Sequence, residues 1–185
     1  MARTPAIAAA EQAGIGFSVH EYEHDPAAES YGVEAAERLR LDPARVFKTL
    51  VLDLYGRLAV AIVPVAAQVD LRSFGKRVGM ADAARAKGAT GYVLGGISPL
   101  GQRRPLPTTI DESALEHETI YVSAGRRGLE LELDPNDLVR LTGASVRAIA
   151  RAIISPSPIR SGEVAIEAAK ATGAKARYVG RSMTA

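Results

Sequence analysis

The sequence predicts an α+β fold with a mixed, mainly antiparallel central sheet and flanking helices. Strand-like and helix-like segments alternate without the regular βαβ repetition of a doubly wound fold. Two runs rich in Val, Ile and Leu, 48–54 and 58–65, are joined by Tyr55-Gly56-Arg57, which is typical of a hairpin of buried strands. Residues 129–133 alternate leucine with glutamate, which indicates a strand with one buried face.

The N-terminal elements carry their own boundary signals. Thr4 as N-cap and Pro5 at the first helical position predict a helix that Gly14 can end. The segment 17–22 then alternates apolar and polar residues and predicts a strand. A narrow apolar stripe predicts a short helix over 31–39.

The remaining elements follow from similar patterns. Helices are predicted over 70–78, 81–87, 135–141 and 146–154, and strands over 108–110 and 119–123. If Ile120 and Val122 are buried beside the leucines of 129–133, the pairing register is fixed, because a slip by one residue would turn those leucines outward. Ser123 and Glu130 then lie opposite one another on the other face of the sheet.

The length of 185 residues suits one domain with a short appendage. We expect the domain to span 1–154, followed over 155–185 by a linker that begins Ser155-Pro156-Ser157-Pro158 and by a basic C-terminal appendage. The appendage is either an RNA contact or a solvated extension. Its basic residues are Arg160, Lys170, Lys175, Arg177 and Arg181.

Composition excludes several classes of chemistry. The chain has no cysteine, which removes disulfides, cysteine-ligated metals and thiol nucleophiles together. His20 and His24 have the spacing of a helical metal pair, but a strand-like run and Pro26 surround them, so we expect no metal and no cofactor. The formal net charge of +2 does not by itself identify a polyanionic partner. Neither a signal peptide nor an apolar run of about 18 residues is present, so a cytoplasmic protein without a membrane partner is expected.

A few polar residues at the ends of predicted elements could converge on one pocket. Lys48 is either a surface lysine or a flexible cation in a cleft, suited to a phosphate or carbonyl oxygen. The loop 95–101 is either a tight turn or a place where Gly95 and Gly96 let backbone N–H groups approach an oxyanion. No nucleophile–base triad, phosphate-binding loop or dinucleotide fingerprint accompanies these residues.

Four segments, taken in order, resemble the YbaK family of Cys-tRNA(Pro) deacylases, which are relatives of the editing domain of bacterial prolyl-tRNA synthetases. They are 22–26 (YEHDP), 46–50 (VFKTL), 91–102 (GYVLGGISPLGQ) and 120–129 (IYVSAGRRGL). The resemblance covers about 4–151, and the long glycine-rich segment makes it specific. It implies an α+β editing domain that hydrolyses the ester between an amino acid and the 3′ adenosine of tRNA. It also implies aminoacylated tRNA as the partner, with prolyl-tRNA synthetase as a further candidate.

The resemblance also implies roles for individual residues. Lys48 matches the essential lysine of the family, and we assign it to anchoring the terminal adenosine or the ester oxygens. The amides of Gly95 and Gly96 would act near the carbonyl. The residues expected to bind substrate are Tyr22, Tyr31, Thr49, Ser98, Gly101, Ser123 and Glu130.

Two positions depart from the family pattern and concern the size of the pocket. Glu130 stands where aspartate is frequent, and Tyr31 stands where phenylalanine is common. Glu130 is a candidate partner for the substrate α-ammonium. In the family, the thiol of the substrate cysteine is thought to attack its own carbonyl, which would explain the missing protein nucleophile. Two alternatives stay open: a deacylase specific for alanine or serine, and a non-catalytic module that binds tRNA or a synthetase.

Overall fold

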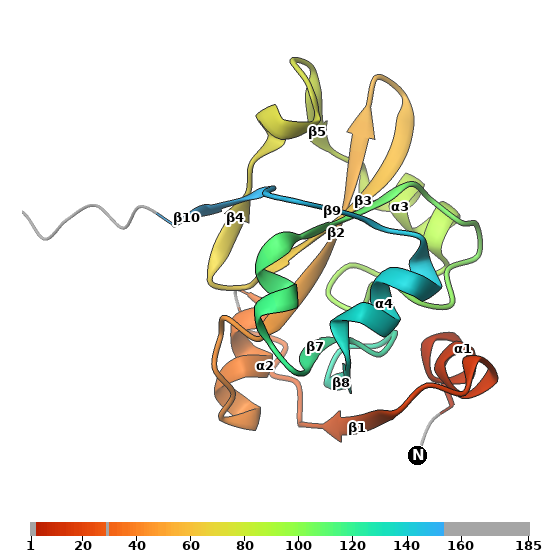
Figure 1. Cartoon of the computed structure of the whole chain (residues 1–185), viewed down its shortest axis with the longest axis vertical. Coiled ribbons are helices and arrows are strands. Elements are labelled where there is room, and N and C mark those ends of the chain that lie inside the picture. Colours follow the sequence, from red (N-terminus) through yellow and green to blue (C-terminus); the bar gives the residue numbers. More distant parts are fainter. Residues whose placement is uncertain (1–2, 29, 154–185) are drawn as a thin grey trace, which may run out of the picture. The chain divides into compact units, whose positions relative to one another are not determined.

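The computed structural model describes residues 3–28 and 30–153 (Figure 1). Its helices are α1 (Pro5–Ala13), α2 (Tyr31–Leu39), α3 (Ala83–Thr90) and α4 (Pro135–Thr142), with short 3-10 helices η1 (Leu71–Phe74) and η2 (Glu112–Glu116). Its strands are β1 (Phe17–Glu21), β2 (Val46–Leu54), β3 (Arg57–Pro64), β4 (Ala67–Val69), β5 (Val78–Met80), β6 (Thr108–Asp111), β7 (Ile120–Ser123), β8 (Leu129–Leu133), β9 (Ser145–Arg147) and β10 (Ala150–Ala152). Within the described ranges, every helix is too short or too polar to cross a membrane.

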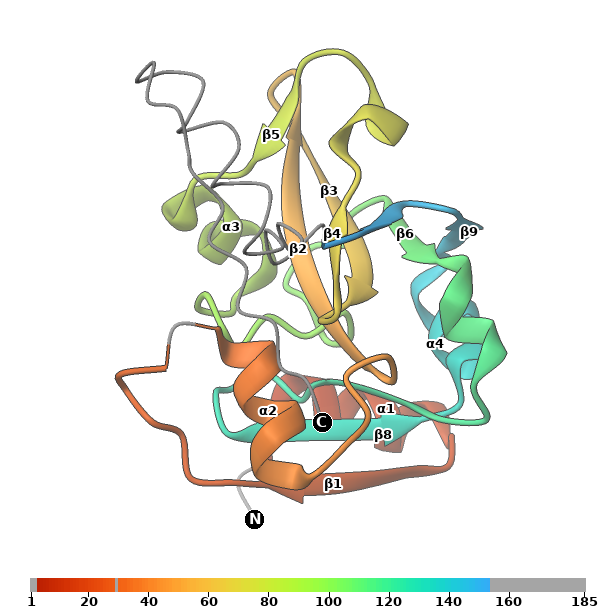
Figure 2. The same cartoon turned by 90° about the vertical axis from the view of Figure 1, so that its left-hand side faces the viewer.

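A mixed sheet runs through the centre of the domain. Its strand order is β1-β8-β7-β2-β3-β6-β9, and β5 also pairs with β2. The pairs β2–β7, β3–β6 and β6–β9 are parallel, whereas β1–β8, β7–β8, β2–β3 and β2–β5 are antiparallel. A separate ribbon of β4 and β10 lies beside β2 (Figure 2). The predicted α+β class with a mainly antiparallel sheet is confirmed.

Helices cover the two faces of the sheet unequally. The main core lies on one face, where α1, α3 and α4 pack Ala6, Ala86 and Leu138 against residues of the sheet such as Ile62 and Leu131. On the other face, α2 packs its alanines against Val46 and Tyr121 in a smaller cluster. Burial of these apolar side chains is the main force that holds the layers together.

Most of the predicted elements form as expected. Thr4 caps α1 by accepting from the amide of Ile7 at 3.2 Å, and the predicted hairpin is β2–β3. Strands β7 and β8 pair in the register that the leucine pattern required, with Ser123 opposite Glu130. Sequence patterns therefore located both the central hairpin and the pair of polar residues beside it.

The predicted helix over 70–78 is wrong. Only the single turn η1 forms, and Gly75, at φ 133°, ends it in a conformation that side chains rarely adopt. The chain then extends as β5 and pairs with Leu52–Leu54 of β2. Pairing with the sheet overrides the local helical pattern.

The predicted helix over 146–154 is also wrong, because this segment forms β9 and β10. The carboxylate of Asp111 accepts hydrogen bonds from the amides of Ile149 and Ala150 at 2.8 and 2.7 Å, which holds the chain extended between the two strands. Burial raises the pKa of Asp111, but the hydrogen bond from the Ser113 hydroxyl, together with those from backbone amides such as Ile149 and Ala150, outweighs burial and holds the pKa below its usual value. The linker and basic appendage predicted over 155–185 lie outside the described residues.

Candidate active site

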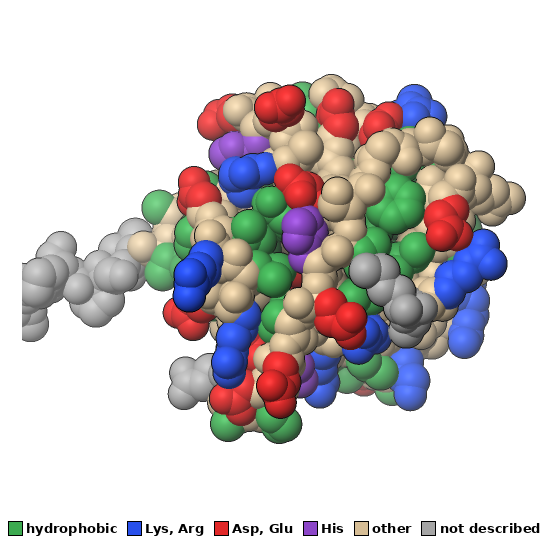
Figure 3. Space-filling view, turned by 90° about the horizontal axis from the view of Figure 1, so that it is seen from below, with side chains coloured by type: hydrophobic (Ala, Val, Ile, Leu, Met, Phe, Trp, Pro, Cys, Tyr) green, Lys and Arg blue, Asp and Glu red, His purple; other side chains and the backbone are tan. Residues whose placement is uncertain are grey.

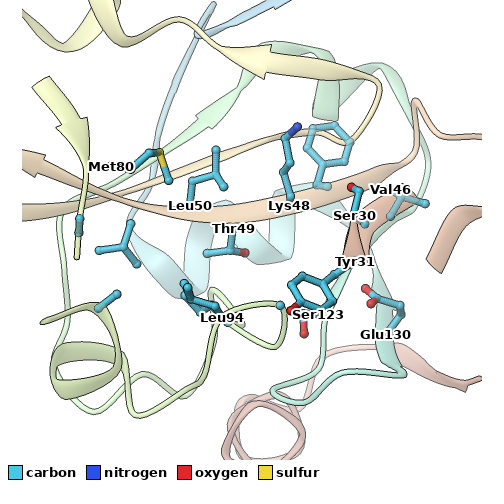
Figure 4. A pocket seen from close by; sticks show the side chains of 17 residues that line it. Ser30, Tyr31, Val46, Lys48, Thr49, Leu50, Met80, Leu94, Ser123 and Glu130 are labelled. Carbon is cyan, nitrogen blue, oxygen red and sulfur yellow. The ribbon is translucent and has the colours of Figure 1, made fainter. Parts of the chain in front are cut away.

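A gap in the pairing of β2 positions the site. On one edge, β2 pairs with β7 only at Val46 and Phe47, and it resumes pairing with β5 only at Leu52. Residues 48–51 on that edge therefore face no neighbouring strand over the intervening stretch. A cavity of about 330 Å³ opens there, between β2, α2, the end of β7 and the loop that follows α3 (Figure 4).

Lys48 lies in the wall of this cavity and is half-buried. Its ammonium donates a hydrogen bond of 2.6 Å to the backbone carbonyl of Ala67, at the start of β4. Burial lowers the pKa of Lys48. Figure 4 shows Lys48 and Leu50 projecting from one side of β2, and Thr49 from the other. The carbonyl of Ala67 thus holds the amine in one place at the cavity edge.

Thr49 and Ser123 supply hydroxyl groups to the same cavity. The hydroxyl of Thr49 is buried and has no hydrogen-bond partner among the described residues. A buried polar atom without a partner is costly, and such atoms are found where a ligand completes the bonding. The hydroxyl of Ser123 is 3.4 Å from the amide of Gly125, from which it accepts a long hydrogen bond.

Glu130 provides the one carboxyl group of the cavity lining. Only 7% of its surface is exposed, and burial raises its pKa to about 8. The carboxyl group of Glu130 makes no hydrogen bond or ion pair in the part of the chain that the structure describes. An isolated carboxyl group in such a place is neutral when the cavity is empty, and it gains a favourable partner when a cation enters.

Tyr31 closes the cavity near Glu130, as Figure 4 shows. The guanidinium of Arg127 lies over the Tyr31 ring at 4.6 Å and also donates to the carbonyl of Leu94 at 3.1 Å. Gly95, at φ 81°, lies directly against the ring, so that a Cβ there would overlap the Tyr31 carbons. Arg127 and Gly95 therefore fix the position of the ring, and Arg127 is a supporting residue that sequence reasoning missed.

The glycine-rich loop divides into two parts with different tasks. Gly95 lines the cavity, and its amide makes no hydrogen bond within the described residues. The amide of Gly96 instead donates to the carbonyl of Val93 at 3.0 Å, so it is not free for a substrate oxygen. Ser98 is fully buried, and Gly101 passes so close to the backbone of Pro5 that no Cβ would fit. The second half of the loop therefore anchors it to α1, away from the cavity.

Tyr22 stands behind the lining of the cavity. Its hydroxyl approaches the carbonyl of Tyr31 at 3.5 Å. Burial, together with the nearby carboxylates of Glu130 and Glu34, raises the pKa of Tyr22 to about 12. The structure thus brings Tyr31, Lys48, Thr49, Gly95, Ser123 and Glu130 together, and it places Tyr22, Gly96, Ser98 and Gly101 outside the lining.

The apolar part of the lining was also missed in the sequence. Leu50, Met80 and Leu94 face the cavity with residues of α2 such as Gly32. A Cβ at Gly32 would overlap a methyl group of Val65, so glycine lets α2 approach the sheet closely. Met80 reaches the cavity because it lies on β5, a strand that the sequence analysis did not predict. No sequence pattern therefore indicated that Met80 lines the site.

The arrangement favours binding and polarisation over metal chemistry. No cluster of potential metal ligands occurs in the described part of the chain, and His20 and His24 instead bond to Glu132 and Glu34 at 2.9 and 2.8 Å. The lining contains no histidine and, since the chain has none, no cysteine. A cation, a partnerless hydroxyl and an isolated buried carboxyl group suit an ester whose carbonyl is polarised and whose amine is bound.

The fold and this cavity suit a hydrolase that binds an amine and polarises an ester carbonyl. Residues 25–141 match the model of the aminoacyl-tRNA editing domain, so the chain belongs to that family. The match includes every cavity residue named above.

Relatives with known sequences or structures agree with this membership. The chain is 34% identical over 157 residues to the "Putative Cys-tRNA(Pro)/Cys-tRNA(Cys) deacylase EbsC" of Enterococcus faecalis, covering 80% of this chain and 93% of that protein. It is 26% identical to a solved structure described as "a putative trans-editing enzyme for prolyl tRNA synthetase", with a TM-score of 0.71, covering 82% of this chain and 99% of the other. A hypothetical protein at 24% identity and a TM-score of 0.70 shares the fold.

Proposed function

We propose that the protein hydrolyses mischarged Cys-tRNA(Pro) to free cysteine and tRNA, acting in trans. The observation that carries the proposal is the cavity, which contains a lysine cation and a buried carboxyl group but neither histidine nor cysteine. An enzyme without its own nucleophile–base pair suits a substrate that brings an attacking group. The name of the Enterococcus relative supports the choice of amino acid.

Charge orients the substrate in this proposal. The α-ammonium of the aminoacyl group binds Glu130, which ionises as the cation arrives. Lys48 binds the ester oxygens or the terminal adenosine, and the amide of Gly95 donates to the carbonyl oxygen as negative charge develops on it. The hydroxyl of Thr49 gains its missing partner from the substrate.

The chemical step needs little from the protein beyond this positioning. The cysteine sulfur bonds to its own carbonyl carbon, the bond from that carbon to the ribose oxygen breaks, and the thiol proton passes to the leaving oxygen. Water then opens the strained thiolactone to free cysteine. Holding the thiol against the carbonyl supplies the rate enhancement, because the step is intramolecular.

A panel of tRNA(Pro) charged with cysteine, alanine or serine tests the proposal. We expect release of cysteine to exceed that of the other two by at least about tenfold, because a thiol is a far better nucleophile than a hydroxyl and alanine has neither. Initial rates of deacylation measured with the full chain, with and without prolyl-tRNA synthetase, give the answer. Faster release of alanine or serine would exclude attack by the substrate thiol and would redirect the assignment to another specificity.

A further inference from the structure

A second cavity, of about 490 Å³, adjoins the first. The two share Lys48, Leu50 and Met80 in their walls. The remaining walls of the second cavity come from β4, from the turn into η1 and from β10. A ligand that extends from the active site past Lys48 therefore enters the second cavity.

The second cavity is positively charged. Arg72 and Arg151 are exposed at its rim and, with Lys48, outnumber its one acidic residue, Asp70. The carboxylate of Asp70 already accepts a hydrogen bond from the amide of Arg72 at 3.1 Å. Neither arginine has an ion-pair partner among the described residues, and the guanidinium of Arg151 donates only to the side chain of Gln68, at 3.1 Å. Both cations are thus free to neutralise an anion.

The arginines on the other side of the active site are already engaged by groups of the protein. On the side of α2, Arg126 is bound to Glu21, and Arg127 is held by Tyr31 and Leu94. The face that carries β1 interleaves acidic and basic side chains (Figure 3).

We infer that the second cavity binds the single-stranded 3′ end of the tRNA, with Arg72 and Arg151 contacting the phosphates that precede the terminal adenosine. This inference rests on the proposed function, which puts the terminal adenosine near Lys48. Leu50, Val69 and Leu71 give the bases an apolar floor, and no aromatic side chain of the described residues lines the cavity. Recognition is therefore of the backbone, independent of sequence, and it strengthens binding without touching the reacting ester.

Three cysteinyl substrates test the inference: the ester of adenosine, the ester of the trinucleotide CCA, and charged tRNA(Pro). We expect the wild type to prefer the CCA ester over the adenosine ester by at least about tenfold in kcat/KM. The double variant Arg72→Gln/Arg151→Gln should lose this preference while hydrolysing the adenosine ester within about twofold of the wild type. For the double variant, the slope of the logarithm of the CCA binding constant against the logarithm of salt concentration should be shallower by about 1.4. Each phosphate contact on a single strand contributes about 0.7 to that slope.

A matched control is Arg57→Gln/Arg104→Gln, which removes two exposed arginines elsewhere, one of them from a third cavity next to α3. It should leave the preference for the CCA ester unchanged. An Arg72/Arg151 variant that keeps the preference, or a control variant that loses it, would overturn the inference.

Failure of the proposed function is recognised separately. In that case the wild type would hydrolyse none of the three cysteinyl esters. Uncharged CCA, labelled with a fluorophore at its 5′ end, still tests whether the second cavity binds the 3′ end. Its affinity is measured for the wild type and for the two double variants. Equal affinity of wild type and Arg72/Arg151 variant would then refute the binding surface, and weaker binding to that variant would support it.

Discussion

The two sides of the active-site cavity differ in what their charged group already contacts. The ammonium of Lys48 has a fixed partner, the carbonyl of Ala67 at 2.6 Å, and it stands at the opening to a second cavity. The carboxyl group of Glu130 has none among the described residues and is nearly enclosed. One side is thus organised before substrate arrives, whereas the other is completed by it. This difference predicts that Lys48 positions the substrate and that Glu130 selects it.

The largest expected effect follows from removal of Lys48, the group that is held in place before substrate binds. Lys48→Ala should lower kcat/KM for Cys-tRNA(Pro) by at least about 100-fold, because no other cation of the described residues lines the cavity and the carbonyl of Ala67 is left without its donor. Single-turnover deacylation measures the loss, and circular dichroism checks that the fold is kept. Wild-type activity in this variant would remove Lys48 from the mechanism.

A smaller effect concerns stability, and it contrasts Glu130 with Glu132 on the same strand. The pKa of Glu130 is raised in the folded protein, to about 8, so the folded state holds a proton that the unfolded state loses above its ordinary pKa near 4.5. Stability must therefore fall as pH rises from about 5 to 8. Glu130→Gln removes this decline, and urea unfolding at several pH values should show the variant gaining stability relative to the wild type toward pH 8.

Glu132 provides the matched control, because its shift has the opposite sign. Burial raises its pKa, but hydrogen bonds from Thr119 and His20 prevail and hold the pKa below its usual value. Its contribution to stability is present above the pKa of the unfolded state and is lost as pH falls through the lower folded value. Glu132→Gln should therefore cost stability at pH 7, where Glu130→Gln does not. Parallel pH profiles of the two variants would refute the difference between the sites.

The sequence predicted the local parts of this site better than its tertiary parts. Leucine alternation placed Ser123 opposite Glu130, and the apolar hairpin placed Lys48 and Thr49 on a central strand, because both patterns reflect burial of one face of a strand. The pair of adjacent glycines indicated Gly95, and the family resemblance added Tyr31. The walls that enclose the cavity depend on contacts between segments distant in the sequence, such as that of Arg127 with the Tyr31 ring. Such contacts leave no periodic pattern in the sequence.

The errors in the sequence-based prediction have the same origin. Segments 70–78 and 146–154 have helical composition, but β5 pairs with β2, and the Asp111 carboxylate holds 149–150 extended. Those two misassigned segments supply Arg72 and Arg151 to the second cavity, and β5, which begins at the end of the first segment, supplies Met80 to both cavities. The part of the structure hardest to predict from sequence is thus the part from which the proposed RNA path is built.

The most direct test of the two-sided account compares cysteinyl-tRNA(Pro) with its analogue lacking the α-amino group, 3-mercaptopropionyl-tRNA(Pro). If Glu130 binds the α-ammonium, the wild type prefers the cysteinyl ester by at least about tenfold in kcat/KM, and Glu130→Gln hydrolyses both esters at similar rates. Glu130→Asp, which keeps the charge, should retain part of the preference. A preference that survives intact in Glu130→Gln would contradict the account.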